Sequence, residues 1–148
     1  MASTDFKTDL ALLIFNNTDI ANIGDAAGLQ NLAAAGNLYV ALHTADPGAG
    51  GKQNTSECAF TGYARQPVAR ASGAGGWTCS VGAISNASAI TYTECSGAGP
   101  EHVTHFSVGY QISGATKIIA SAELTTHRDV DVGVTLSFAI GELDVTIT

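Results

Sequence analysis

The pattern of apolar and polar positions changes near residue 37, from a helical period before it to a period of two after it. In residues 4–15 the apolar side chains fall on one helical face: Phe6, Leu10, Leu13 and Ile14. Ser3 or Thr4 can cap the start of this segment, and Asn16-Asn17 can end it. The spacing therefore predicts a helix over 4–15.

A second short helix is predicted over 26–35. This segment is rich in Ala and Leu, and Gly36 follows it at the position where glycine commonly ends a helix. Together the two helices make residues 1–36 a helical N-terminal segment. Neither helix is large enough to supply the core.

From Leu38 onward, short alternating stretches are separated by Gly-rich turn signals at a spacing of about 10 to 15 residues. Such spacing is typical of an all-β sandwich. We expect one domain over 1–148, mainly β, in which residues 37–148 form a jelly-roll-like antiparallel β-sandwich of about eight strands. The strands predicted are 38–44, 58–70, 77–82, 87–92, 102–111, 116–123, 133–139 and 142–148.

Two details of this pattern bear on strand pairing. Pro67 cannot donate to a sheet ladder, so strand 58–70 is expected to be an edge there or to break near Gln66. Gly141-Glu142 separates the last two strands, and we expect the pair to form a tight hairpin.

The composition points to a surface covered by neighbours. Only 13% of the residues are charged, about half the usual share, and small neutral side chains fill the gap. Such side chains lose little rotamer entropy on burial. A secreted or simply low-charge domain is the alternative interpretation.

The charge excludes some partners. The chain has 13 acidic and 6 basic residues, a net charge of −7, and the basic residues are scattered. A phosphate-binding stripe is therefore not expected, and neither is direct nucleic-acid binding. The acidity would also repel an anionic membrane surface, and no apolar run reaches the roughly 20 residues of a membrane span.

The three cysteines, Cys58, Cys79 and Cys95, form no CxxC pair and no zinc pattern. We expect each cysteine to be a small packing residue in a protein made in a reducing cytoplasm; one disulfide with one cysteine left over is the alternative. The first residues lack the basic and apolar regions of a signal peptide.

Candidate chemistry is sparse. His102 and His105 are three apart in a predicted strand and should point to opposite faces, and His43 can bond the turn backbone near Asp46. No Gly-x-Ser-x-Gly elbow and no phosphate cradle are present. A cation site at Asp129 and Asp131 is possible, but a solvated turn is the preferred interpretation. We therefore predict no catalytic residue, no cofactor and no metal, and a protein that is not an enzyme.

Contact residues are predicted from loops and ends. The loop 46–57 is long and has three glycines, so it is either a contact loop or simply solvent-exposed. Tyr63 and Trp77 flank Gly-rich loops and suit partner contact, although a carbohydrate platform uses the same residue types. The full set of contact candidates is Phe6, Leu10, Asp46, Pro47, Lys52, Tyr63, Trp77 and Arg128.

Several stretches resemble a family of small tailed-bacteriophage virion proteins, often labelled phage tail fibre proteins. The resemblance runs from about residue 20 to about residue 145. It is carried by Leu38 to Gly48, Phe60 to Arg65, Val68-Ala69-Arg70, Gly76-Trp77, Ile84-Ser85-Asn86, Ala89 to Tyr92 and Val103 to Gly109. Some members of that family are jelly-roll capsid decoration (cement) proteins, and the family has no catalytic motif.

The resemblance implies a virion structural protein. The expectation is a decoration protein on the capsid exterior that bridges and stabilises neighbouring capsid subunits. Its partners would be the major capsid protein and copies of itself, as a homo-oligomer, with segment 1–36 and loop 46–57 in contact. The alternatives are a tail, neck or fibre adaptor of the virion and a glycan-binding module of the receptor-binding apparatus.

Overall fold

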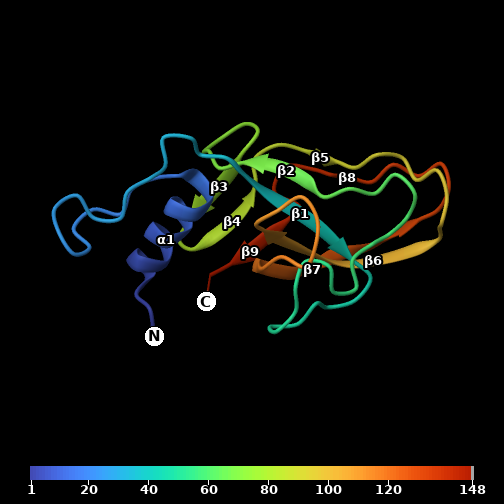
Figure 1. The fold of residues 1–148 in the computed structure, drawn as a ribbon, viewed down its shortest axis with the longest axis horizontal. Coiled ribbons are helices and arrows are strands. Elements are labelled where there is room, and N and C mark those ends of the chain that lie inside the picture. The colour runs from blue at the N-terminus through green and yellow to red at the C-terminus, as the bar shows by residue number, and fades with distance from the viewer. Residues whose placement is uncertain (148) are drawn as a thin grey trace.

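The computed structural model describes residues 1–147, and these form one helix and nine strands (Figure 1). The helix is α1 (Thr4–Asn16). The strands are β1 (Asn37–His43), β2 (Gln66–Ala69), β3 (Trp77–Ser80), β4 (Ala83–Asn86), β5 (Ile90–Thr91), β6 (Glu101–Gly109), β7 (Ile118–Val130), β8 (Ser137–Phe138) and β9 (Asp144–Thr146). They build a four-stranded sheet in the order β2-β1-β6-β7, a three-stranded sheet β3-β4-β9 and a pair β5-β8.

All strand pairs within these sheets are antiparallel. The buried apolar side chains form one cluster to which the strands of all three sheets contribute, together with α1. The predicted mainly β class is confirmed, and the arrangement is consistent with a β-sandwich.

Helix α1 forms where the pattern predicts it. The Ser3 side chain accepts a hydrogen bond from the Phe6 amide at 3.2 Å, and Asn17 ends the helix in the left-handed region at φ 55°. The buried side chains are Ala11 and Phe15, whereas Phe6 is 43% exposed. The Phe15 ring meets Trp77 edge-on, with centroids 5.1 Å apart, so the helix covers β3 and β4.

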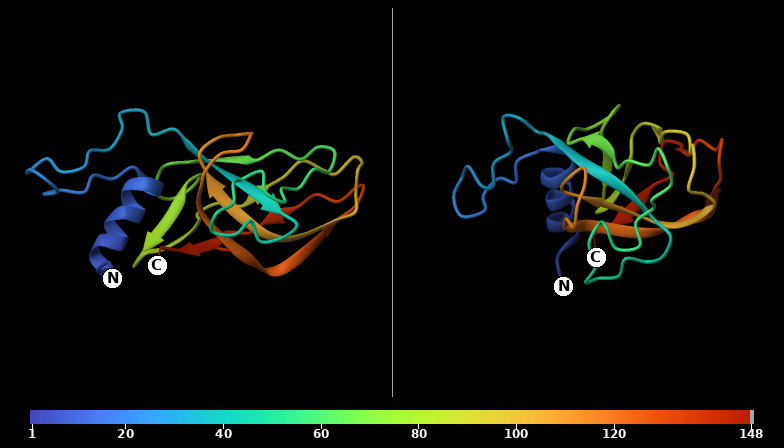
Figure 2. Two further views of the ribbon diagram at one scale, coloured as in Figure 1. Left: turned by 60° about the horizontal axis from the view of Figure 1, so that its bottom comes forward. Right: turned by 45° about the vertical axis from the view of Figure 1, so that its right-hand side comes forward.

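The predicted helix over 26–35 is wrong. Residues 18–36 instead form an extended arm that stands clear of the sheets in both views of Figure 2. A short Ala-rich helix is marginal in water unless a face of it is buried, and this segment buries almost nothing. Turn chemistry from Asp25 and Gly28 therefore decides its conformation.

The predicted strand 58–70 is shorter than expected. Only Gln66–Ala69 joins the sheet, as edge strand β2, where Pro67 lies opposite Tyr39. Both expectations for Pro67 are confirmed, because the strand is an edge and it begins at Gln66. Residues 58–65 run irregularly because their polar side chains bind inward, as described below.

The predicted tight hairpin at the C-terminal end is also wrong. β8 pairs with β5 and β9 pairs with β4, so the two segments flanking Gly141 lie in different sheets. The Asn86 side chain, 1% exposed, donates to the Ala139 carbonyl at 2.8 Å and accepts from the Leu143 amide at 3.0 Å. Backbone groups on both sides of Gly141 are thereby bound to β4, and Thr148, the end of the predicted last strand, lies outside the described residues.

Candidate functional site: a projecting arm and a lysine surface

The arm (residues 18–36) is a two-limbed loop closed by backbone hydrogen bonds. Ile20 and Leu29 exchange N–H···O bonds of 2.9 Å in both directions. At the tip, the Asp25 carboxylate accepts from the amides of Ala27 and Gly28. Gly28 has φ 68°, and a Cβ there would lie 1.9 Å from the Ile20 carbonyl oxygen, so this position requires glycine.

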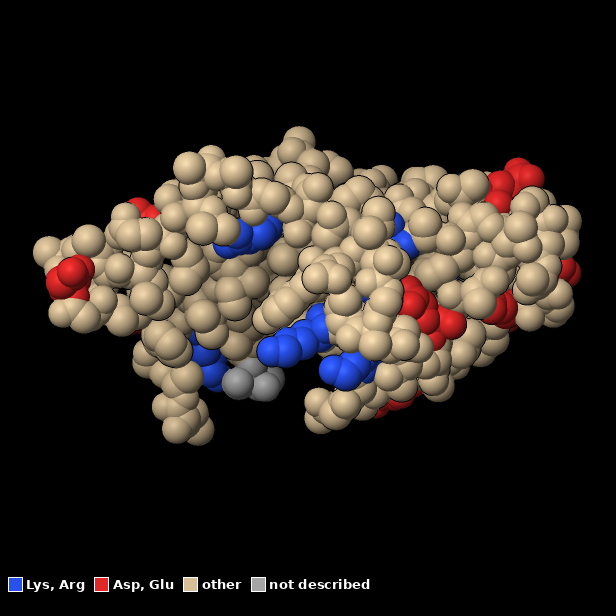
Figure 3. Space-filling model, viewed as in Figure 1, with Lys and Arg blue, Asp and Glu red and all other residues tan. Residues whose placement is uncertain are grey.

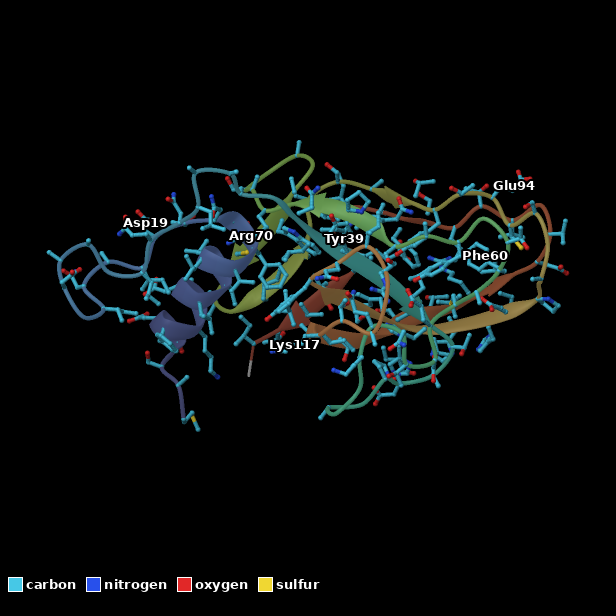
Figure 4. All side chains as sticks on the ribbon, in the orientation of Figure 1. Asp19, Tyr39, Phe60, Arg70, Glu94 and Lys117 are labelled. Carbon is cyan, nitrogen blue, oxygen red and sulfur yellow. The ribbon has the colours of Figure 1, made fainter. Side chains whose placement is uncertain are left out.

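The base of the arm is fixed to the body. The Asn17 side chain both donates to the Leu32 carbonyl at 2.8 Å and accepts from its amide at 2.9 Å. Arg70, which follows β2, donates to the carbonyls of Leu13 and Ile14 at the end of α1 and to that of Ala35 in the arm. One guanidinium thus holds the helix end and the arm together at the edge of the sheet (Figure 4).

Beyond its base the arm is exposed and partly apolar. Ile23, Leu29 and Leu32 are 38%, 45% and 58% exposed, and Ile20 is the buried exception at 5%. A surface that shows several large apolar side chains on one projecting segment is typical of an interaction site.

The loop 46–57 is packed against the sheet rather than free in solvent. Asp46 accepts from the Gly48 amide at 2.8 Å, which is the expected turn chemistry, and Pro47 is buried. Gln53 is fully buried, donating to the Tyr39 carbonyl at 2.9 Å and accepting from the Thr116 hydroxyl at 2.7 Å. Lys52 is exposed, so of this loop's candidates Asp46 and Lys52 face solvent.

A buried ion pair organises the polar interior beside this loop. Arg65, 2% exposed, binds both carboxylate oxygens of Glu57 at 2.7 Å. Its remaining N–H groups donate to loop 110–117, at the Gln111 and Gly114 carbonyls and the Thr116 hydroxyl. Sequence reasoning missed this network, since in the sequence Arg65 is only one of six scattered basic residues.

His43 does not bond the turn at Asp46 as predicted. Its ring is fully buried, with Nδ1 2.8 Å from the Thr55 carbonyl oxygen and Nε2 2.8 Å from the Ser107 hydroxyl. Burial lowers the pKa of His43 below its ordinary value, and the bond to Thr55 opposes that effect in part. His43 is therefore a neutral internal group that joins the loop to β6.

Trp77 is not available as a contact residue. It is 1% exposed, in the core against Phe15, and its indole N–H has no hydrogen-bond partner in the part of the chain that the structure describes. Tyr63 is half-buried: it stacks on Tyr92 and its hydroxyl donates to Glu57 at 2.9 Å. Burial raises the pKa of Tyr63. A carbohydrate-binding platform that uses the Trp77 indole is therefore not supported, because this side chain is buried.

The stretch around Arg128 is strand rather than a solvated turn. β7 continues to Val130, so Asp129 lies on a strand and bonds His102 at 2.6 Å. Arg128 pairs with Glu142. Burial alone would raise the pKa of Glu142, but bonds from the Ala139 amide and Arg128 outweigh it and lower that pKa.

The described residues include no group of three or more His, Cys, Asp or Glu side chains placed to hold a metal ion. The three cysteines carry free thiols; burial raises the pKa of Cys58, and raises that of Cys79 to about 11. Thiols with a raised pKa, such as those of Cys58 and Cys79, are poor nucleophiles at neutral pH. Within residues 1–147 no helix is long and apolar enough to cross a bilayer.

The lysine surface is defined by Lys52, Lys117, Tyr110 and Ile112. Lys52 and Lys117 form an isolated antiparallel bridge, so two like charges lie side by side on exposed positions. Tyr110 and Ile112, on the loop that leads to Lys117, are 55% and 57% exposed. Sequence reasoning named Lys52 but could not pair it with Lys117, because only the fold brings the two loops together.

Comparison with known protein families identifies a match. A family model described as "Podophage GP4 fiber I protein gp80" matches residues 18–146. The match begins with the arm and spans β1 to β9, while α1 lies before it. A search of curated proteins finds no match to the chain.

Proposed function

The chain belongs to the podophage fibre-protein family gp80 and is a bacteriophage virion structural protein, and we propose that it is a subunit of a fibre of the virion. The observation that carries the proposal is the extent of the family match, which includes both the arm and the β body. The fibre named in the family's description is thereby the first candidate for this chain's place in the particle.

The geometry supports a mechanical rather than a catalytic role. The titratable groups in and beside the core hold segments of the fold together. His43 bonds the Thr55 carbonyl, and Arg65 bonds both the Glu57 carboxylate and the Gly114 carbonyl. This leaves them fixed in structural bonds. What the molecule offers to partners is shape: a hydrogen-bonded body with one projecting arm.

Capsid decoration, with the major capsid protein as partner, is the second candidate. The low fraction of charged residues favours it, because a surface of small neutral side chains is readily covered by a shell. In this case the same arm would bridge neighbouring capsid subunits.

Counting copies in purified virions tests the proposal. A fibre subunit should be present in roughly 3 to 12 copies per fibre set, because appendages follow the low-order symmetry of the tail, whereas a decoration protein should be present in hundreds. Quantitative mass spectrometry against a tail protein and the major capsid protein gives the number. A count in the hundreds would favour decoration, and absence from virions would overturn both assignments.

A further inference from the structure

We infer that the arm of one copy docks on the lysine surface of a second copy of this chain, in a head-to-tail contact. This deepens the proposed function by naming the partner, and it rests on that function only for where the contact occurs in the virion.

The arm carries acidic as well as apolar side chains. Asp19 and Asp25 are its charged residues, and both are exposed. Their carboxylates accept backbone amide bonds within the arm, from Asn31 and from Ala27 and Gly28. Those bonds fix the carboxylates on the surface, beside the exposed Ile23 and Leu29.

The lysine surface carries the opposite charge. The three arginines are engaged within the fold, with Glu57, with the helix end and with Glu142. By contrast, none of the three lysines lies within ion-pair distance of a carboxylate in residues 1–147. Lys52 and Lys117 thus bring two unpaired positive charges together in a chain of net charge −7.

A hollow beside the lysine surface can accept an apolar side chain. It measures about 280 Å³, and it is lined by Cys58, Tyr63, Ala64 and Ile112 and by the Glu57 carboxylate, whose charge is paired with Arg65. Arg65, which also lines it, binds Thr116, the neighbour of Lys117. An Ile or Leu side chain of the arm could therefore enter the hollow while Asp19 or Asp25 approaches the lysines.

A second copy is the occupant that the charge pattern favours. Figure 3 shows two neighbouring blue side chains near the lower middle of one face and others nearer the arm, with red side chains at the arm's end, beside the middle blue pair and toward the opposite end. In Figure 4, Asp19 lies at the arm and Lys117 near the middle of the body, so the two patches are separate on one molecule. Copies that each carry −7 repel in general, but this pairing brings opposite charges together. The contact joins two different patches and is therefore heterologous, so it continues into a ring or an open chain.

The first test is self-association of the purified full-length chain by sedimentation equilibrium, from micromolar to millimolar concentration. We expect concentration-dependent association that weakens with salt. Ile23→Ser should weaken it by about tenfold in Kd, a loss typical of a single apolar interface side chain. Ile140→Ser is the matched control, because Ile140 is 70% exposed on another part of the chain. A wild-type monomer throughout, or equal effects of the two variants, would overturn the inference.

The second test exchanges charges between the two patches. One variant makes the arm positive (Asp19→Asn and Asp25→Asn with Ala26→Lys), and Asn at each position retains the oxygen that accepts the backbone amides. The other makes the surface negative (Lys52→Glu with Lys117→Glu). Each variant alone should stay monomeric, whereas an equimolar mixture should associate, since both head-to-tail contacts in the mixture pair opposite charges. A mixture that stays monomeric contradicts the inference.

The solution measurements test the contact between copies, and the virion count tests the fibre assignment, so each proposal can be contradicted without the other. A chain that self-associates as described but occurs in hundreds of copies leaves the contact intact and removes the fibre assignment. A low copy number with a strictly monomeric chain keeps the fibre assignment and removes the contact.

Discussion

Some basic side chains are bonded within the fold, and others lie exposed. Arg65, Arg70 and Arg128 hold carboxylates or backbone carbonyls of distant segments, which suits the fixed, multi-donor guanidinium. Lys52 and Lys117 lie exposed and adjacent. The arginines therefore stabilise the fold, and Lys52 and Lys117 are the positive charges available for contact with a partner.

Loss of Arg65 should be strongly destabilising. Arg65→Ala leaves the Glu57 carboxylate, 17% exposed, without its cationic partner, although the Tyr63 hydroxyl still donates to it. It also removes the donor to the Gln111 and Gly114 carbonyls. We expect a loss of about 3–5 kcal/mol in the free energy of unfolding, measured by urea denaturation. Arg128→Ala, in the more exposed pair with Glu142, is the control and should cost about 1 kcal/mol or less. Equal losses would show that burial of the pair is not what matters.

His43 should make stability depend on pH. Because burial lowers its pKa in the folded chain, the unfolded chain binds the proton more readily. The contribution is complete above the ordinary histidine pKa of about 6.5 and is lost as the pH falls toward the folded value. Glu57, which raises the pKa of His43, and Arg65 and His105, which lower it, are the nearby charges.

The measurement is unfolding free energy between pH 7.5 and 5 for the wild type and His43→Gln. The wild type should lose stability with a steeper slope than the variant. Parallel curves for the wild type and His43→Gln would contradict the buried neutral role.

At the scale of elements, α1 and the arm differ in what holds them. The helix is fixed by apolar burial of Ala11 and Phe15, whereas the arm is fixed by hydrogen bonds and buries only Ile20. Elements of the first kind contribute stability, and elements of the second kind are available for contact.

Two phenylalanines on α1 test this distinction. Phe15→Ala removes a fully buried ring that packs on Trp77 and should cost about 3–5 kcal/mol. Phe6→Ala, on the same helix but 43% exposed, should change stability by no more than about 0.5 kcal/mol. Thermal or urea unfolding measures both, and a small effect of Phe15→Ala would show that the helix is not part of the cooperative unit.

The sequence predicts elements where periodic burial decides them. The helix over 4–15 and the strands at 38–44 and 102–111 follow this rule. It fails where polar side chains decide: Asp25 and Gly28 shape the arm, Arg65 shapes 58–65, and Asn86 separates β8 from β9. The bonds of Arg65 and Asn86 join residues far apart in the chain, so no local pattern contains them. The Asp25 turn is local, but the Ala-rich pattern around it favours a helix.

The candidate site was predictable in the same uneven way. Segment 1–36 was named as a contact element, but as a helix rather than an arm. Lys52 was named alone, because its pairing with Lys117 exists only once the loops meet. Trp77 was misplaced, since a flanking Gly-rich loop does not reveal that the indole turns into the core.

At the scale of the whole molecule, charge is distributed unevenly over an elongated body (Figures 1 and 3). One protruding end bears apolar and acidic groups, and the middle bears Lys52 and Lys117. Such an arrangement favours directional assembly, in which each subunit offers two different surfaces. The family match over residues 18–146 covers both surfaces.

The most direct test of the fibre assignment is to locate the chain on the particle. Purified virions would be imaged by electron cryo-microscopy after labelling with an antibody fragment directed at the end near Glu94, away from the arm (Figure 4). We expect label on the fibres and none over the capsid shell. Label spread over the capsid surface would contradict it.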